Sequence, residues 1–155
     1  MQEQVTERML IAGAPDQCYA ILTQFEDYPQ WAADIKSVHI DERDARGNAA
    51  LVTFRAAAFG RSTSLTLRYD YSEAPGKFSW KQERGDITRR YDGSYELFPS
   101  GDGGTEVVYT LVVDLVVPLP GFVKRRAEGR ITSTALRELK ARVESAGAPQ
   151  PAAEA

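Results

Sequence analysis

Residues 105–145 read TEVVYTLVVDLVVPLPGFVKRRAEGRITSTALRELKARVES, and this stretch decides the fold. From Val107 to Leu115 every second residue is apolar, which is typical of a strand with one buried face. Residues 118–121, Pro-Leu-Pro-Gly, end that strand, and residues 122–145 then change to helical spacing. The apolar stripe of the predicted helix consists of Val123, Ala127, Ile131, Ala135, Leu139 and Val143. At 1.5 Å per residue such a helix is about 36 Å long, enough to cross a small domain.

Upstream of this stretch the apolar residues also alternate with period two. We predict strands over residues 5–12, 36–44, 49–58, 62–72, 76–84 and 89–98, in addition to 105–117. Short turns separate them, among them Arg46-Gly47-Asn48 and residues 101–104, Gly-Asp-Gly-Gly. Connections this short predict an antiparallel meander rather than parallel units with crossover helices.

Two short helices are expected between the first two strands. One runs from Pro15 to about Phe25, and a second begins at Asp27, where Gln30 would complete a capping box. The predicted architecture is therefore α+β: a curved antiparallel seven-stranded sheet wrapped around one long C-terminal helix. Where the sheet curves away from the helix, side chains would leave a cavity.

Length and composition place the chain among ordinary globular proteins. Its 155 residues, 43% hydrophobic and 26% charged, suit one domain over 1–146, and the small, Pro-rich residues 147–155 are predicted to be a disordered tail. No apolar run approaches the ~20 residues of a membrane span, so we expect no integral membrane association. The single cysteine, Cys18, fits a reducing cytoplasm. Fourteen Arg against five Lys, with abundant Ala, suggest a GC-rich bacterial genome.

The same composition excludes several functions. A net charge of −3 argues against a nucleic-acid-binding surface. With one histidine and one cysteine the chain cannot build a zinc site of nitrogen and sulfur ligands, and we expect no metal and no cofactor. A Ser-His-Asp device would have to use His39, which alternates in phase with Ser37 and Asp41, away from the apolar face.

Aromatic side chains concentrate on the inward faces of the predicted strands. Two interpretations stay open, a filled core or a ligand pocket in which tyrosine hydroxyls supply a few polar contacts. The predicted ligand-binding residues are Phe54, Tyr69, Trp80, Tyr91, Tyr95 and Tyr109, with Tyr71 and Phe78 on the same faces. Trp31, on the second short helix, is expected outside this pocket.

Several strings resemble a known superfamily. They are residues 14–16 (Ala-Pro-Asp), 25–31 (Phe-Glu-Asp-Tyr-Pro-Gln-Trp), 79–80 (Ser-Trp), 91–97 (Tyr-Asp-Gly-Ser-Tyr-Glu-Leu), 104–109 and 118–126. With the order of elements, they resemble the START / polyketide cyclase superfamily (SRPBCC) and its helix-grip fold over residues 3–145. The resemblance implies an internal, largely apolar cavity for a lipid-like or polycyclic molecule.

The resemblance leaves three functions open. Binding or transport of a hydrophobic small molecule is favoured, and an aromatic polyketide cyclase/dehydratase is the alternative. A non-enzymatic interaction protein is the third, of the ribosome-associated toxin or coenzyme-Q-binding type. Those two groups usually carry a Cys shortly after the YPxF-like segment, whereas residues 31–34 here read Trp-Ala-Ala-Asp.

No catalytic residue is assigned from the sequence. A cyclase needs an acid or base within reach of its substrate, and a tyrosine is a poor base unless a cation lies near it. Arg89 or Arg90 beside Tyr91 is the one arrangement to test, since Arg55 and Arg68 are expected to be exposed. Lys124, Arg125 and Arg126, with Arg130, are interpreted as a solvated face or as the site of an anionic partner. Gly129 in the same helix is expected to permit close packing or to leave room for ligand.

Overall fold

One antiparallel sheet of seven strands dominates the computed structural model, which describes residues 3–147. The strands are β1 (Glu3–Ile11), β2 (Ile35–Arg43), β3 (Ala49–Ala58), β4 (Arg61–Asp70), β5 (Lys77–Gly85), β6 (Thr88–Pro99) and β7 (Thr105–Leu115). They are ordered β1-β7-β6-β5-β4-β3-β2. Each predicted strand is present, with ends shifted by no more than two residues. The predicted α+β class and antiparallel meander are confirmed.

The short helices between β1 and β2 differ in part from the prediction. Helix α1 spans Pro15–Thr23, and η1 is a 3-10 helix over Phe25–Gln30. The predicted capping box is wrong, because η1 begins two residues before Asp27 and its N-cap, Gln24, makes no side-chain cap. Instead Gln30 Nε2 donates to Asp27 Oδ1 at 3.4 Å within the helix. Phe25, only 2% exposed, anchors the first turn on the core and sets the earlier start.

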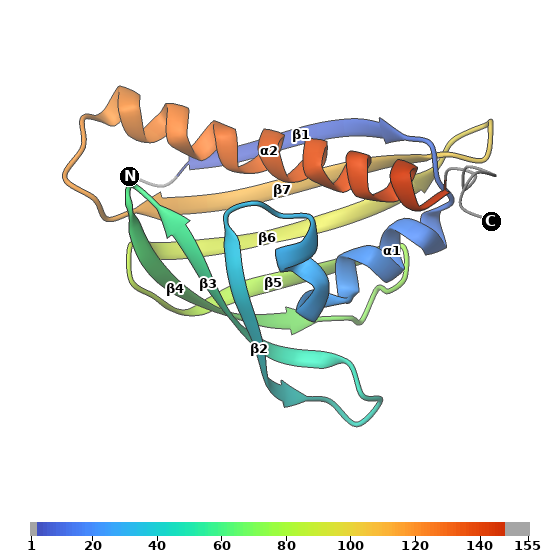
Figure 1. The fold of residues 1–155 in the computed structure, drawn as a ribbon, viewed down its shortest axis with the longest axis horizontal. Helices are drawn as coiled ribbons and strands as arrows, with labels where there is room; N and C mark the ends of the chain where they lie inside the picture. Colours follow the sequence, from blue (N-terminus) through green and yellow to red (C-terminus); the bar gives the residue numbers. More distant parts are fainter. Residues whose placement is uncertain (1–2, 148–155) are drawn as a thin grey trace, which may run out of the picture.

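The long helix α2 (Gly121–Gly147) packs mainly against β1 and β7, along one edge of the sheet (Figure 1). Leu139 and Val143 of the predicted stripe are fully buried, as is Leu136, which the stripe did not include. Ile131 is only partly buried. The apolar residues of α2 are therefore buried more completely in its C-terminal half, whereas the fully buried residues of its N-terminal half are Glu128 and Thr132.

Irregular pairing bends the sheet away from α2. Register shifts interrupt β2–β3 at Ile40/Glu42, β4–β5 at Thr66/Leu67 and β6–β7 at Thr88/Arg90. Such bulges increase local twist and bend a strand. Helix α1 contacts α2 and β6, and η1 packs against β2, so these small elements close one end of the gap (Figure 1). The space over the middle strands stays unfilled by backbone.

None of the helices within residues 3–147 is long and apolar enough to cross a membrane. Residues 148–155, which form most of the predicted disordered tail, lie outside the described residues.

Candidate functional site: an aromatic cavity beneath the long helix

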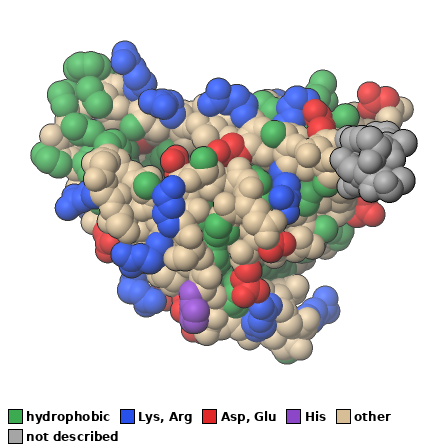
Figure 2. Space-filling view, viewed as in Figure 1, with side chains coloured by type: hydrophobic (Ala, Val, Ile, Leu, Met, Phe, Trp, Pro, Cys, Tyr) green, Lys and Arg blue, Asp and Glu red, His purple; other side chains and the backbone are tan. Residues whose placement is uncertain are grey.

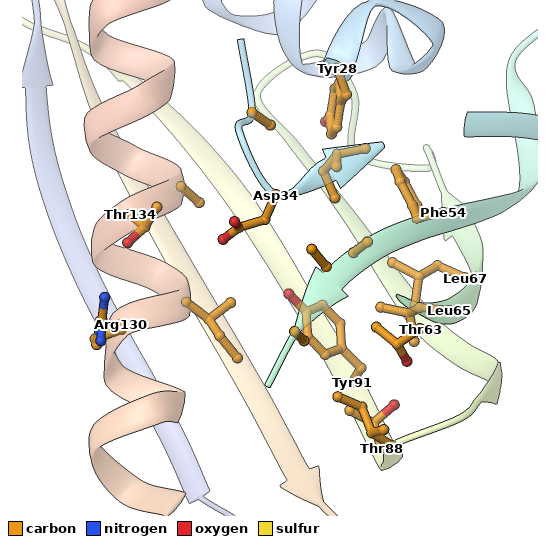
Figure 3. A pocket seen from close by; sticks show the side chains of 18 of the residues that line it. Tyr28, Asp34, Phe54, Thr63, Leu65, Leu67, Thr88, Tyr91, Arg130 and Thr134 are labelled. Carbon is orange, nitrogen blue, oxygen red and sulfur yellow. The ribbon is translucent and has the colours of Figure 1, made fainter. Parts of the chain in front are cut away.

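A cavity of about 670 Å³ lies between α2, η1 and strands β3 to β7 (Figure 3). This volume is within the ~300–1,000 Å³ typical of small-molecule sites. Its wall is mostly apolar and aromatic, and its floor is the concave face of the sheet. Of the two interpretations of the inward aromatic residues, a filled core or a ligand pocket, the cavity favours the pocket.

All six residues predicted to bind ligand line this cavity: Phe54, Tyr69, Trp80, Tyr91, Tyr95 and Tyr109. Their rings contact one another, with centroids 4.5 Å apart for Tyr95 and Tyr109 and 5.4 Å for Trp80 and Tyr95. Phe78 also lines the cavity, and Tyr71 stacks against Phe78. Period-two alternation is the sequence signal that brings them to one face.

Trp80 can lie against the sheet because its cross-strand neighbour is glycine. Trp80 on β5 pairs with Gly93 on β6. A Cβ at position 93 would lie 2.7 Å from Trp80 Cζ2 and 2.6 Å from the carbonyl oxygen of Thr110. Gly93 therefore makes space for the indole, which is 4% exposed, and within residues 3–147 the buried Trp80 Nε1 finds no hydrogen-bond partner.

The tyrosine hydroxyls around the cavity remain neutral. Tyr28 donates to the Leu22 carbonyl oxygen at 2.6 Å, and the hydroxyls of Tyr91 and Tyr109 bond to each other. Burial raises the pKa of Tyr91, although the bond from Tyr109 opposes the rise, and it raises the pKa of Tyr69, Tyr95 and Tyr109 well above the ordinary value. The cavity therefore offers uncharged hydroxyls rather than ready bases.

The structure does not place Arg89 or Arg90 in the cavity beside Tyr91, as the cyclase arrangement would require. Arg89 Nη1 lies 3.2 Å from Asp114 Oδ2, with 67% of its side chain exposed, and Arg90 Nε lies 2.8 Å from Asp92 Oδ2. Neither arginine lines the cavity. The bulge between Thr88 and Arg90 changes the alternation here, so that Thr88 and Tyr91 line the cavity instead.

The other polar residues considered from the sequence lie on the outside of the sheet, as expected. The His39 side chain is 77% exposed, and its Nδ1 lies 2.8 Å from Asp41 Oδ1. Arg55 and Arg68 are also exposed, and Arg68 pairs with Glu83 and Glu42. In the part of the chain that the structure describes, no three His, Cys, Asp or Glu side chains gather to hold a metal ion.

Among the described residues that line the cavity, the charged side chains lie at its mouth. Asp34 points toward α2, from which Arg130 and Thr134 project (Figure 3), and Glu138 Oε2 accepts a hydrogen bond from Ala33 N at 3.0 Å. Because Asp34, Phe59 and Arg130 line the cavity and are also exposed, the mouth lies between the start of β2, the β3–β4 turn and α2.

Of these mouth residues, Arg130 was considered from the sequence only as part of a basic face, and Asp34, Thr134 and Glu138 were missed. Arg130, Thr134 and Glu138 are spaced four apart, so they form a polar stripe beside the apolar stripe of α2, and that pattern could have shown them. Trp31 also lines the cavity, contrary to expectation. It is the residue that follows the last turn of η1, and its ring contacts the ring of Tyr28, with 4.9 Å between the centroids.

A curved antiparallel sheet that grips one long helix around an apolar cavity defines a helix-grip protein of the START type. The family model for polyketide cyclase / dehydrase and lipid transport matches residues 2–144, so the chain belongs to that family. The superfamily indicated by the sequence is thereby confirmed. No curated protein matches the chain.

Solved structures share the fold at low sequence identity. A START superfamily protein from Mycobacterium smegmatis aligns with a TM-score of 0.85 and 23% identity, over 92% of this chain and 97% of that one. The ZhuI aromatase/cyclase from Streptomyces sp. R1128 aligns with a TM-score of 0.79 and 17% identity, over 93% and 94%. A protein from Thermus thermophilus gives a TM-score of 0.78 and 22% identity, over 94% and 100%. Identities this low carry the fold and not the ligand.

Proposed function

We propose that this protein binds a hydrophobic, lipid-like or polycyclic small molecule in the cavity beneath α2 and carries or sequesters it without strong catalysis. The observation that supports this most is the wall of the cavity, where an aromatic and aliphatic lining surrounds about 670 Å³. Charges are confined to its mouth, at Asp34, Arg130 and Glu138. Transfer of an apolar ligand from water to such a lining is favourable at roughly 25 cal/mol per Å² buried.

A cyclase acting on an aromatic polyketide is the second candidate. It is favoured by the family and by the shape shared with an aromatase/cyclase. The Tyr91 hydroxyl, which accepts a hydrogen bond from Tyr109, could donate its own proton to an enolate oxygen. The cyclase would also need a general base that works near neutral pH. The described carboxylates of the lining, Asp34 and Glu138, lie at the mouth of the cavity, and burial raises the pKa of the tyrosines inside it.

Two measurements on the purified protein distinguish the candidates. Native mass spectrometry of protein from its own host, followed by extraction, should find a bound apolar molecule that was not chemically changed by the protein. In a cyclisation assay with a poly-β-ketone, we expect no acceleration.

Accelerated cyclisation that is lost in Tyr91→Phe would replace the binding proposal with the cyclase. Arg89→Ala and His39→Ala are the controls for that assay, because both side chains point away from the cavity toward Asp114 and Asp41.

A further inference from the structure

Three large apolar side chains are exposed at one end of the molecule, around the mouth of the cavity. Phe59 is 48% exposed at the β3–β4 turn, Val116 is 48% exposed after β7, and Phe122 is 60% exposed in the first turn of α2. Phe59 lines the cavity together with Leu115 and Ala127, so the three segments meet at the same end. Figure 2 shows the hydrophobic side chains gathered over the start of α2, with Lys and Arg side chains at their border.

Five cations surround this apolar cluster: Arg61, Lys124, Arg125, Arg126 and Arg130. Within residues 3–147 none of the five forms an ion pair with a carboxylate. The whole chain carries a net charge of −3, so an excess of basic residues in the protein does not explain why these five lie together. The cations gather instead at the start of α2, whose first turn contains no acidic residue, and at the β3–β4 turn.

Helix stability does not account for these residues. The first turn of α2 contains no acidic residue, and Lys124, Arg125 and Arg126 follow at the end where the helix dipole favours negative charge. The backbone of Phe59 has φ of +53°, a left-handed conformation that a bulky aromatic residue rarely adopts. Unfavourable residues kept at exposed positions indicate a function for this surface.

We propose that this end of the molecule docks on the surface of an anionic lipid bilayer. Phenylalanine and valine side chains would enter the boundary between headgroups and acyl chains, while the five cations contact anionic headgroups. A lipid surface fits better than a protein partner, because exposed apolar side chains from three separate segments stand beside cations that have no carboxylate partner within residues 3–147, the combination that a boundary of anionic headgroups and acyl chains would satisfy. The docking does not depend on the identity of the cavity ligand.

Flotation with vesicles tests this docking. Phosphatidylcholine vesicles are compared with vesicles that also contain about 30 mol % phosphatidylglycerol, at low salt and at about 0.5 M NaCl. We expect at least about tenfold more protein on the anionic vesicles, and loss of most of it at high salt. Equal binding to both vesicles, or binding to neither, would overturn the proposal.

Matched variants locate the surface. The triple variant Lys124→Gln, Arg125→Gln, Arg126→Gln should reduce binding about tenfold, whereas Arg46→Gln, Lys81→Gln, Arg84→Gln removes equal charge from exposed positions elsewhere and should not. Equal losses in the two triples would refute the assignment to this end.

The apolar contribution is tested separately. Phe122→Ser should weaken binding to the anionic vesicles, and Phe98→Ser, which removes a 44% exposed phenylalanine near the opposite end of β6, should leave it unchanged. In Phe122→Trp, quenching by brominated lipid should report insertion directly, and its absence contradicts the proposal. Binding to poly-L-glutamate without binding to vesicles would assign the surface to an acidic protein and overturn the lipid proposal.

Discussion

At the scale of single residues, the contact of Gly93 with the indole of Trp80 shapes the floor of the cavity. Any side chain at position 93 would collide with both the indole and the backbone of β7, at 2.7 and 2.6 Å. We therefore expect Gly93→Ala to lower the free energy of unfolding by about 1–3 kcal/mol, as overpacking does. Chemical denaturation with Trp fluorescence measures it, and an unchanged stability would show that Trp80 does not lie against the sheet.

The buried tyrosines give the protein a specific response to alkali. Burial raises the pKa of Tyr28, Tyr69, Tyr71, Tyr95 and Tyr109 in the folded state. In the unfolded chain they ionise near pH 10, so the unfolded state loses protons that the folded state keeps. The stability that these groups contribute is complete below about pH 10 and falls as the pH rises above it.

We thus predict that tyrosine ionisation, followed by absorbance near 295 nm, coincides with loss of the far-ultraviolet circular dichroism signal. The chain in urea should instead titrate near the ordinary tyrosine pKa of about 10. Native protein whose tyrosines all titrate near that value with an intact dichroism spectrum would contradict the burial described above.

At the scale of elements, α2 carries a glycine that no packing contact among the described residues requires. A Cβ at Gly129 would meet no atom within 4 Å, so the expectation that this glycine permits close packing is wrong. Glycine in a helix costs about 1 kcal/mol relative to alanine. Gly129→Ala should raise the free energy of unfolding by about that amount. Urea denaturation measures it, and a destabilised variant would mean that α2 lies closer to its neighbours than described.

In the β3–β4 turn, an exposed residue occupies a position at which another residue would make the fold more stable. Its two central residues, Phe59 and Gly60, have φ of +53° and +73°, and such turns favour Asn-Gly. Phe59→Asn should therefore stabilise the fold by about 1 kcal/mol while weakening binding to anionic vesicles. Thermal unfolding and flotation of one sample test both. A variant that is less stable and binds fully would refute the interpretation of Phe59.

At the scale of the whole molecule, the periodic patterns predicted most of the architecture. The alternation in β4, β6 and β7 and the stripe of α2 are long, and each of them predicts an element that the structure contains. The start of η1 was not predictable from local signals, because a tertiary contact of Phe25 with the core outweighs the capping sequence at Asp27. Short elements depend on such contacts more than long ones do.

The cavity could be predicted only in part. Alternation alone brought the six aromatic residues to one face. The positions of Asp34 and Trp31 depend on how η1 joins β2, which has no periodic signal. The failure of Arg89 to reach Tyr91 follows from a bulge, where one extra residue reverses the side-chain direction that alternation predicts.

The central claim, that the cavity beneath α2 binds a hydrophobic molecule, is tested most directly by calorimetric titration of a neutral apolar probe such as N-phenyl-1-naphthylamine. Ala127→Phe with Ala135→Phe places two rings in the cavity from α2, whereas Ala141→Phe with Ala146→Phe adds the same rings to exposed positions of the same helix. We predict a Kd of roughly micromolar, about −8 kcal/mol, for the wild type and the exposed variant, and at least about tenfold weaker binding for the filled variant. Equal affinity in all three proteins would contradict the claim.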